Sequence, residues 1–147
     1  MNYHIRKSEY CDLGSIVRLL ADDKLGKGRE AAENLEMYLA SYKEILESPF
    51  FDVFVMGDEN SKEIIGTYQM MFLPHLSFEG TRRAQIESVR ILSTLRGKGL
   101  GEKLMEHAIE QAQENGCGIV QLTSNKDRSE QAHGFYKKLG FSSTHEV

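Results

Sequence analysis

A glycine-rich turn between a strand-like segment and a helix-like segment limits the possible folds of this chain more than any other feature. Residues 84–92 are rich in β-forming side chains, and residues 100–114 carry apolar side chains at helical spacing. Between them the chain reads Arg96, Gly97, Lys98, Gly99, Leu100, Gly101. Glycines lack the Cβ atoms that would keep a ligand off the backbone, so N–H groups and the positive end of the next helix can converge on an anion. The sequence therefore predicts a strand, an anion-binding turn and a helix.

Two common nucleotide-binding motifs do not fit this turn. A Walker phosphate loop needs four residues between its first glycine and a Gly-Lys pair that Ser or Thr follows, and no segment of the chain meets that requirement. A dinucleotide fingerprint needs a third glycine where this chain has Glu102, and it normally follows the first strand of a βαβ unit. The remaining alternatives are a phosphate group of another kind of ligand and a glycine turn without a ligand.

The rest of the pattern predicts one α/β domain over residues 1–147. Apolar and polar residues alternate in several short runs, and longer runs have apolar residues at helical spacing. We expect strands at 3–6, 50–56, 64–70, 84–92, 118–122 and within 141–147, and helices at about 12–25, 29–46, 100–114 and 129–139. The polar residues 57–62 favour a turn, so the second and third strands are expected to form a β-hairpin.

The composition argues against several functional classes. A formal net charge of -4 disfavours general nucleic-acid binding, which needs a concentrated basic face, and mildly favours a cationic partner. The first ten residues include Arg6, Lys7 and Glu9 and no apolar run, and no segment has membrane-spanning length. We therefore expect a soluble cytoplasmic protein without membrane contact. Cys11 and Cys117 have no metal or disulfide spacing and are expected to be small buried residues; the histidines have no ligand spacing, so no metal is expected.

Two segments of the chain resemble signatures of the GNAT superfamily of N-acetyltransferases. Residues 96–101 match the family's Arg/Gln-x-x-Gly-x-Gly/Ala signature, and residues 132–141 (Ala-His-Gly-Phe-Tyr-Lys-Lys-Leu-Gly-Phe) resemble its A-x-x-F-Y-x-K-x-G-F segment. Their order and separation also fit the family, and the expected elements extend the resemblance over essentially the whole chain. The resemblance implies the GNAT acyl-CoA N-acyltransferase fold, an α/β fold with a central mixed, mostly antiparallel twisted sheet flanked by helices. It also implies acetyl-CoA as the co-substrate.

The resemblance further implies how this chain contacts acetyl-CoA. Members of the family bind the pyrophosphate on the loop that corresponds here to Arg96, Gly97, Lys98, Gly99, Leu100 and Gly101. The pantetheine arm pairs like an extra strand with the strand before that loop, which implies a role for backbone groups of Ile91 and Leu92. Asn125 is a candidate for a hydrogen bond to the pantetheine or the acetyl carbonyl, with a turn residue as the alternative. Many members have asparagine where this chain has Ser129, so that contact is weaker here or passes to Asn125 or Arg128.

Acetyl transfer to an amine requires two proton movements. An alkyl amine with a pKa near 10.4 is almost wholly protonated at pH 7, yet only its neutral form attacks a thioester. The departing thiolate, whose thiol has a pKa of about 8.5, is helped by a proton donor. The resemblance places the family's tyrosine at Tyr136, which is the candidate acid. Glu87 is the candidate base and needs a water relay or a raised pKa, because an ordinary glutamate titrates at about 4.3; a salt-bridged surface role is the alternative.

These residues favour direct transfer of an acetyl group from acetyl-CoA to a primary amine in a ternary complex, with a small molecule as the favoured acceptor. Two other functions stay open: a non-catalytic acyl-CoA-binding or regulatory module, and an N-acetyltransferase of proteins or peptides. His75 and the acidic residues Asp22, Asp23, Glu30 and Glu79 suit the acceptor side or are simply solvated. Many relatives continue beyond the point where this chain ends, which leaves either a short last hairpin or a homodimer in which a second subunit completes the edge.

Overall fold

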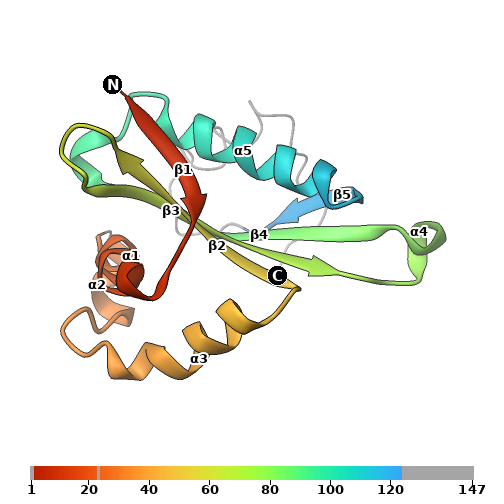
Figure 1. Ribbon diagram of the computed structural model, residues 1–147, viewed down its shortest axis with the longest axis horizontal. Helices are drawn as coiled ribbons and strands as arrows, with labels where there is room; N and C mark the ends of the chain where they lie inside the picture. The colour runs from red at the N-terminus through yellow and green to blue at the C-terminus, as the bar shows by residue number, and fades with distance from the viewer. Residues whose placement is uncertain (1, 23, 124–147) are drawn as a thin grey trace.

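A five-stranded sheet forms the centre of the molecule in the computed structural model, which describes residues 2–22 and 24–123 (Figure 1). The strands lie in sequence order: β1 (Tyr3–Lys7), β2 (Phe51–Asp58), β3 (Ile64–Leu73), β4 (Arg82–Ile91) and β5 (Cys117–Leu122). The first four pair antiparallel, and β5 joins β4 in parallel. The prediction of a mixed, mostly antiparallel sheet is therefore confirmed. The helix and strand expected over 129–147 lie outside the described residues.

Helices cover both faces of this sheet (Figure 1). On one face lies the 15-residue helix α5 (Leu100–Glu114), and on the other lie α1 (Leu13–Ala21), α2 (Lys24–Arg29) and α3 (Glu36–Glu47). Short 3-10 turns, η1 (Tyr10–Asp12) and η2 (Ser93–Leu95), precede α1 and follow β4, and α4 (Ser77–Gly80) is a single turn at the tip of the β3–β4 hairpin. No helix in the described part of the chain is long and apolar enough to cross a membrane.

The alternation of side chains along β2 divides the interior into two cores. Phe54 and Met56 point to the α5 face, where they join the fully buried Leu104 and Ala108 of the helix. The neighbouring Val53 and Val55 belong to the second core, which α1 and α3 cover. A strand that is buried on both faces is expected to be almost continuously apolar, and this is the pattern of residues 53–56.

The structure corrects three expectations from the sequence. The helix expected at about 12–25 is divided, because α1 ends at Ala21 and a separate helix, α2, runs from Lys24 to Arg29. The helix expected from residue 29 begins only at Glu36, because the preceding segment is held in an irregular path by the Tyr38 hydroxyl, which accepts a hydrogen bond from Ala31 N at 2.7 Å and contacts the Glu30 carboxylate at 3.0 Å. The expectation that both cysteines are buried is wrong for Cys11, which is exposed in η1 at the surface, whereas Cys117 is half-buried. Apolar character alone does not place a residue inside when its element lies at the edge of the fold.

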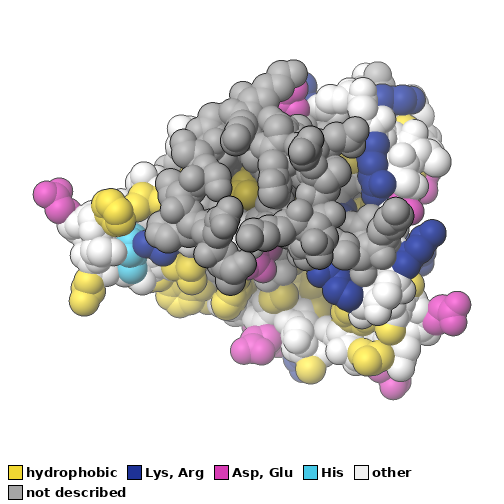
Figure 2. Space-filling view, turned by 180° about the vertical axis from the view of Figure 1, so that it is seen from behind, with side chains coloured by type: hydrophobic (Ala, Val, Ile, Leu, Met, Phe, Trp, Pro, Cys, Tyr) yellow, Lys and Arg dark blue, Asp and Glu magenta, His cyan; other side chains and the backbone are white. Residues whose placement is uncertain are grey.

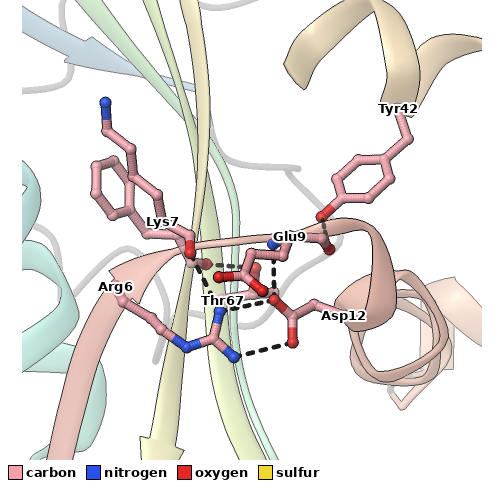
Figure 3. A network of polar contacts seen from close by, with 7 residues as sticks. Arg6, Lys7, Glu9, Asp12, Tyr42 and Thr67 are labelled. Atoms are coloured by element: carbon pink, nitrogen blue, oxygen red, sulfur yellow. Dashed lines mark hydrogen bonds and ion pairs between the residues drawn. The ribbon is translucent and has the colours of Figure 1, made fainter. Parts of the chain in front are cut away.

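A polar network ties β1 to η1 and α3 (Figure 3). The guanidinium of Arg6 donates to both carboxylate oxygens of Asp12, at 2.7 and 3.0 Å, and the backbone N–H of Glu9 donates to the same carboxylate at 2.7 Å. The hydroxyl of Tyr42 donates to the Glu9 carbonyl at 2.6 Å. Asp12 is 5% exposed, so its charge is stabilised by these donors and not by water.

Candidate active site

The sheet opens where β4 and β5 separate. β5 pairs with β4 only from Arg82 to Ile86, whose partner is Leu122 at the end of β5. β4 continues to Ile91 and stays paired with β3 on its other side. In the described part of the chain, β4 therefore runs on from Glu87 to Ile91 beyond the end of its pairing with β5. An unpaired strand edge offers backbone donors and acceptors to an extended ligand.

A β-bulge lies at the start of this extension of β4. Gln69 of β3 faces Glu87, but Thr67 faces Arg90, so β4 has one more residue than β3 over this interval. The extra length is accommodated at Ser88, whose φ of 54° is in the left-handed region. Such a conformation is strained for a residue with a Cβ, and bulges of this kind re-aim neighbouring groups next to active sites.

Valine at position 88 is expected to destabilise the protein, because a β-branched side chain is poorly tolerated at positive φ. We expect Ser88→Val to lower the free energy of unfolding by about 1 to 2 kcal/mol, measured by urea titration. Ser88→Gly is the matched control and should stay closer to wild type, since glycine adopts this φ without strain. Equal losses for the two variants would contradict the strain assigned to Ser88.

Backbone alternation decides which groups of β4 face the opening. The N–H of Leu92 donates to the Ile65 carbonyl of β3 at 2.9 Å, and the Leu92 carbonyl accepts from Leu95 N at 2.9 Å. Because consecutive residues of a strand direct their N–H and C=O groups to opposite edges, those of Ile91 point to the free edge. Of the two residues singled out in the sequence, Ile91 thus presents its backbone to the opening, while Leu92 is bonded within the protein.

The glycine turn forms an open cradle between η2 and α5. Gly97 and Gly99 both have a φ of 80°, and a Cβ built on either would meet no heavy atom within 4 Å. Gly99 is the N-cap of α5 and supplies no side-chain hydrogen bond to the helix. The first N–H groups of a helix lack carbonyl partners within it, so here they are available to a ligand. The cradle therefore fits a phosphate or pyrophosphate group, and Leu100, buried behind it, anchors the helix end.

Positive charge surrounds this end of the molecule. On the face shown in Figure 2, lysine and arginine side chains gather along the right-hand edge, which is the end that holds α1, α2 and the start of α5 in Figure 1. Arg96 and Lys98 of the cradle are both exposed. The Nη2 of Arg96 donates to the carbonyl of Asp22, at the end of α1, at 2.8 Å. This contact holds the guanidinium beside the cradle.

A hydrogen bond between the buried Tyr68 and the half-buried His107 links the sheet to α5 next to the bulge. Tyr68 lies on β3 between the two residues that bracket the bulge, and its hydroxyl shares a hydrogen bond of 2.7 Å with Nδ1 of His107 on α5. Phe54 stacks on Tyr68 with ring centroids 5.1 Å apart. Burial raises the pKa of Tyr68 and lowers the pKa of His107, so both groups stay neutral near pH 7. The hydrogen bond joins β3 to α5 beside this part of β4 and adds no charge there.

The structure brings some of the expected site residues together and separates others. Glu87 is exposed on β4, opposite Gln69 and next to the bulge, in the same strand that leads into the cradle. His75 and Glu79 belong to the β3–β4 hairpin tip, at the other end of β4 from the cradle. The candidates Asn125, Ser129 and Tyr136 lie outside the described residues.

Two features of the site were missed by reasoning from the sequence. Nothing in the residues around Ser88 indicates a bulge, because a serine between β-forming residues is unremarkable in a strand. Asp22 was considered for the acceptor side, yet its carboxylate accepts hydrogen bonds from the N–H of Ser93 at 2.8 Å and from its hydroxyl at 3.1 Å. These residues are 71 positions apart, so only the folded chain reveals the contact. No group of three or more potential metal ligands occurs among the described residues.

The separation of β4 and β5 beside a glycine turn at a helix N-terminus can be compared with known proteins, and the comparison identifies a class of enzymes. Residues 15–141 match the acetyltransferase (GNAT) family. The chain therefore belongs to this family of acyltransferases, as the resemblance of its two motifs predicted.

Individual relatives differ in what they are known for. A crystal structure described as a transcriptional regulator from Bacillus halodurans C-125 is 40% identical, with a TM-score of 0.93 and coverage of 99% of this chain and 97% of that one. The thialysine N-epsilon-acetyltransferase of Bos taurus is 27% identical over 92% of this chain and 82% of its own length. The aminoalkylphosphonate N-acetyltransferase of Salmonella typhimurium is 28% identical, but the match spans 56% of this chain and only half of that protein.

Proposed function

We propose that this protein transfers the acetyl group of acetyl-CoA to a small primary amine by direct attack in a ternary complex. The observation that carries the proposal is the continuity of the free edge of β4 with the open cradle at the N-terminus of α5. A ligand with an extended amide-bearing arm and a pyrophosphate matches both parts at once. CoA has both an amide-bearing arm and a pyrophosphate. The backbone groups of these two parts of the site, with Arg96 and Lys98, are sufficient to bind them.

Each part of the site has a distinct task in binding. The N–H groups at the start of α5, with Arg96 and Lys98, neutralise the pyrophosphate. The backbone groups of Ile91 pair with the pantetheine amides as a neighbouring strand would. The thioester then lies farther back along β4, toward the bulge at Ser88 and the exposed carboxylate of Glu87. Binding by backbone groups leaves the side chains of this edge free to position the acceptor.

The reaction needs a neutral amine and a leaving thiol. Glu87, through a water molecule, accepts a proton from the substrate ammonium, and the neutral nitrogen attacks the thioester carbonyl. The new C–N bond forms, the C–S bond breaks, and Tyr136 supplies a proton to the departing sulfur, so CoA leaves as the thiol. The proton lost from the amine nitrogen on acylation restores the tyrosine through solvent. No covalent intermediate on the protein is required.

The acceptor is expected to be a small cationic molecule. The bovine and Salmonella relatives are named for small amino compounds, thialysine and aminoalkylphosphonate. Glu87 is exposed and so can meet a substrate ammonium at the open face of β4. The net charge of -4 also favours a cation over an anion as the approaching partner.

The proposal is tested by two measurements on the full chain. Titration calorimetry with acetyl-CoA should show binding below millimolar concentration, and a panel of primary amines should release free CoA thiol, detected with a thiol reagent. Absence of binding at millimolar acetyl-CoA would exclude the proposal. Mass spectrometry of incubated proteins and peptides separates small-molecule transfer from acetylation of lysines or N-termini.

Removing the hydroxyl of Tyr136 should slow turnover without weakening cofactor binding. General acid catalysis usually contributes about a hundredfold or more, but a thiolate leaves more readily than an alkoxide, so we expect kcat of Tyr136→Phe to fall about twentyfold. The loss should shrink as the pH approaches the thiol pKa of about 8.5. An unchanged kcat across this range would remove Tyr136 from the mechanism.

A second function is favoured by one comparison. The 40% identical Bacillus halodurans structure is described as a transcriptional regulator, which supports a module that binds acyl-CoA and regulates without turnover. This alternative predicts acetyl-CoA binding in calorimetry together with no thiol release from any amine in the panel. Steady thiol release that depends on the amine would decide for the enzyme.

A further inference from the structure

Asp22 joins the end of α1 to the turn that leads into the cradle. Its backbone N–H closes α1 by donating to the Leu19 carbonyl at 3.2 Å. Its two carboxylate oxygens accept from the N–H and the hydroxyl of Ser93, at 2.8 and 3.1 Å. Its carbonyl accepts from Nη2 of Arg96 at 2.8 Å. One residue thus holds both ends of the segment from η2 to the first residue of the cradle.

The cradle depends on contacts of this kind because its own residues do little to fix its shape. Gly97 and Gly99 are in the left-handed region and have no side chains to pack. At the α5 end, the buried Leu100 anchors the chain. At the β4 end, Leu95 packs at the margin of the core, whereas Ser93 and Arg96 are exposed and are held by Asp22.

We infer that Asp22 is a positioning residue for CoA: it fixes the path of residues 93–96 and the direction of the Arg96 guanidinium before the ligand arrives. In naming CoA as the ligand, the inference rests on the proposed function. A loop that is already ordered in the free protein binds its ligand more tightly, because no conformational entropy is lost in ordering it on binding. Asp22 acts through Ser93 and Arg96 and does not need to touch CoA.

The contacts of Asp22 also argue against its use as an acceptor-binding carboxylate. Both oxygens are occupied by Ser93, so a substrate ammonium would have to share them. This competing role makes a different kinetic prediction: loss of Asp22 would raise KM for the amine and leave CoA binding unchanged. The experiment below separates the two roles.

Two substitutions at position 22 and one elsewhere form the test. Asp22→Ala removes both side-chain contacts, whereas Asp22→Asn keeps an oxygen for the Ser93 N–H and an NH₂ group that can donate to the Ser93 hydroxyl. Asp58→Ala is the control, because the Asp58 carboxylate also accepts a backbone hydrogen bond at an exposed position, but from Asn60 N at 2.9 Å within the β2–β3 turn and not from the segment 93–96.

The inference predicts a specific pattern of results. For Asp22→Ala, the Kd for CoA by calorimetry should rise about tenfold, which corresponds to about 1.4 kcal/mol, while kcat at saturating acetyl-CoA stays within twofold. Asp22→Asn should remain within about threefold of wild type, since its hydrogen bonds persist. In the ligand-free protein, amide hydrogen exchange over residues 93–99 should be faster in Asp22→Ala and unchanged in Asp58→Ala.

Four outcomes would overturn the inference. Unchanged CoA affinity in Asp22→Ala would do so, as would a rise in KM for the amine alone, or unchanged hydrogen exchange over 93–99. If wild type itself fails to bind CoA, the proposed function fails, and the exchange measurement still decides whether Asp22 orders this turn. An equal rise in Kd for Asp58→Ala would show a general loss of stability and would also reject a positioning role.

Discussion

Alanine at position 99 is expected to lower the affinity for CoA by about a hundredfold, or about 2.7 kcal/mol. Gly99 is the N-cap of α5 and has a φ of 80°, so a Cβ there would strain the backbone and shift the N–H groups at the start of the helix, which we propose bind the pyrophosphate. Loss of one or two hydrogen bonds to a charged group, each contributing about 1.5 to 3 kcal/mol, accounts for the size of the effect. Calorimetry with CoA measures it directly.

The same helix offers a matched control at its other end. Gly116, just beyond the C-terminus of α5, has a φ of 74° and an equally open environment. Gly116→Ala therefore introduces a comparable backbone strain, and both variants should lose about 1 to 2 kcal/mol of stability. Only Gly99→Ala should lose CoA affinity. A similar Kd for the two variants would mean that CoA does not use the cradle.

Neutralising the buried carboxylate of Asp12 is expected to destabilise the fold. In Asp12→Asn, the Arg6 guanidinium loses its charged partner at 2.7 Å, and the Glu9 N–H loses a charged acceptor. Removing one member of a buried pair costs about 3 to 5 kcal/mol, and because the Arg6 side chain is 36% exposed we expect about 2 to 3 kcal/mol. Urea unfolding at pH 7 measures the loss.

The stability difference between wild type and Asp12→Asn should depend on pH in a definite direction. Burial alone would raise the pKa of Asp12, but hydrogen bonds from Arg6 and the Glu9 N–H hold that pKa below its usual value. The stabilisation is therefore complete above the unfolded-state pKa of about 3.9 and is lost as the pH falls through the lower folded-state pKa. The difference between wild type and Asp12→Asn should be constant from pH 7 to 5 and shrink below pH 4.

The pKa of Asp52 is shifted in the opposite direction to that of Asp12. Burial raises the pKa of its carboxyl, and Lys7 at 3.6 Å offsets this only in part. Its ionised form is thus less favourable in the folded protein than in the unfolded chain, so wild type loses stability relative to Asp52→Asn as the pH rises above about 3.9. If Asp12→Asn and Asp52→Asn shifted in the same direction with pH, the charge environments described here would be wrong.

Periodic segments were predicted well because local spacing specifies them. The helix 100–114 and the hairpin around residues 57–62 agree with α5, β2 and β3 to within a few residues. The helix expected from residue 29 begins seven residues later, at Glu36, since helical spacing of apolar residues says nothing about the Tyr38 hydroxyl that holds the preceding segment. The prediction that Cys11 is buried was wrong for a related reason: burial depends on which elements cover a residue, and local spacing does not show this.

The chemical character of the donor site follows from residues that are close in sequence. Three glycines within Arg96 to Gly101, followed by an amphipathic helix, favour an anion-binding turn, since the torsional freedom of glycine and the unpaired N–H groups at a helix start are local properties. Family membership rests on the same local pattern together with the segment 132–141. These conclusions needed no coordinates.

Pairings between distant residues required the folded chain. Strand register decides where the β4–β5 pairing ends, at Ile86, and where the bulge lies, at Ser88. The hydrogen bond between Asp22 and Ser93 joins residues 71 positions apart in the sequence. A sequence period of two specifies the faces of a strand but not where its neighbour ends or gains a residue. The amino-acid sequence thus predicted an anion-binding turn before α5, and the tertiary structure decided where β4 and β5 separate and which contacts hold that turn in place.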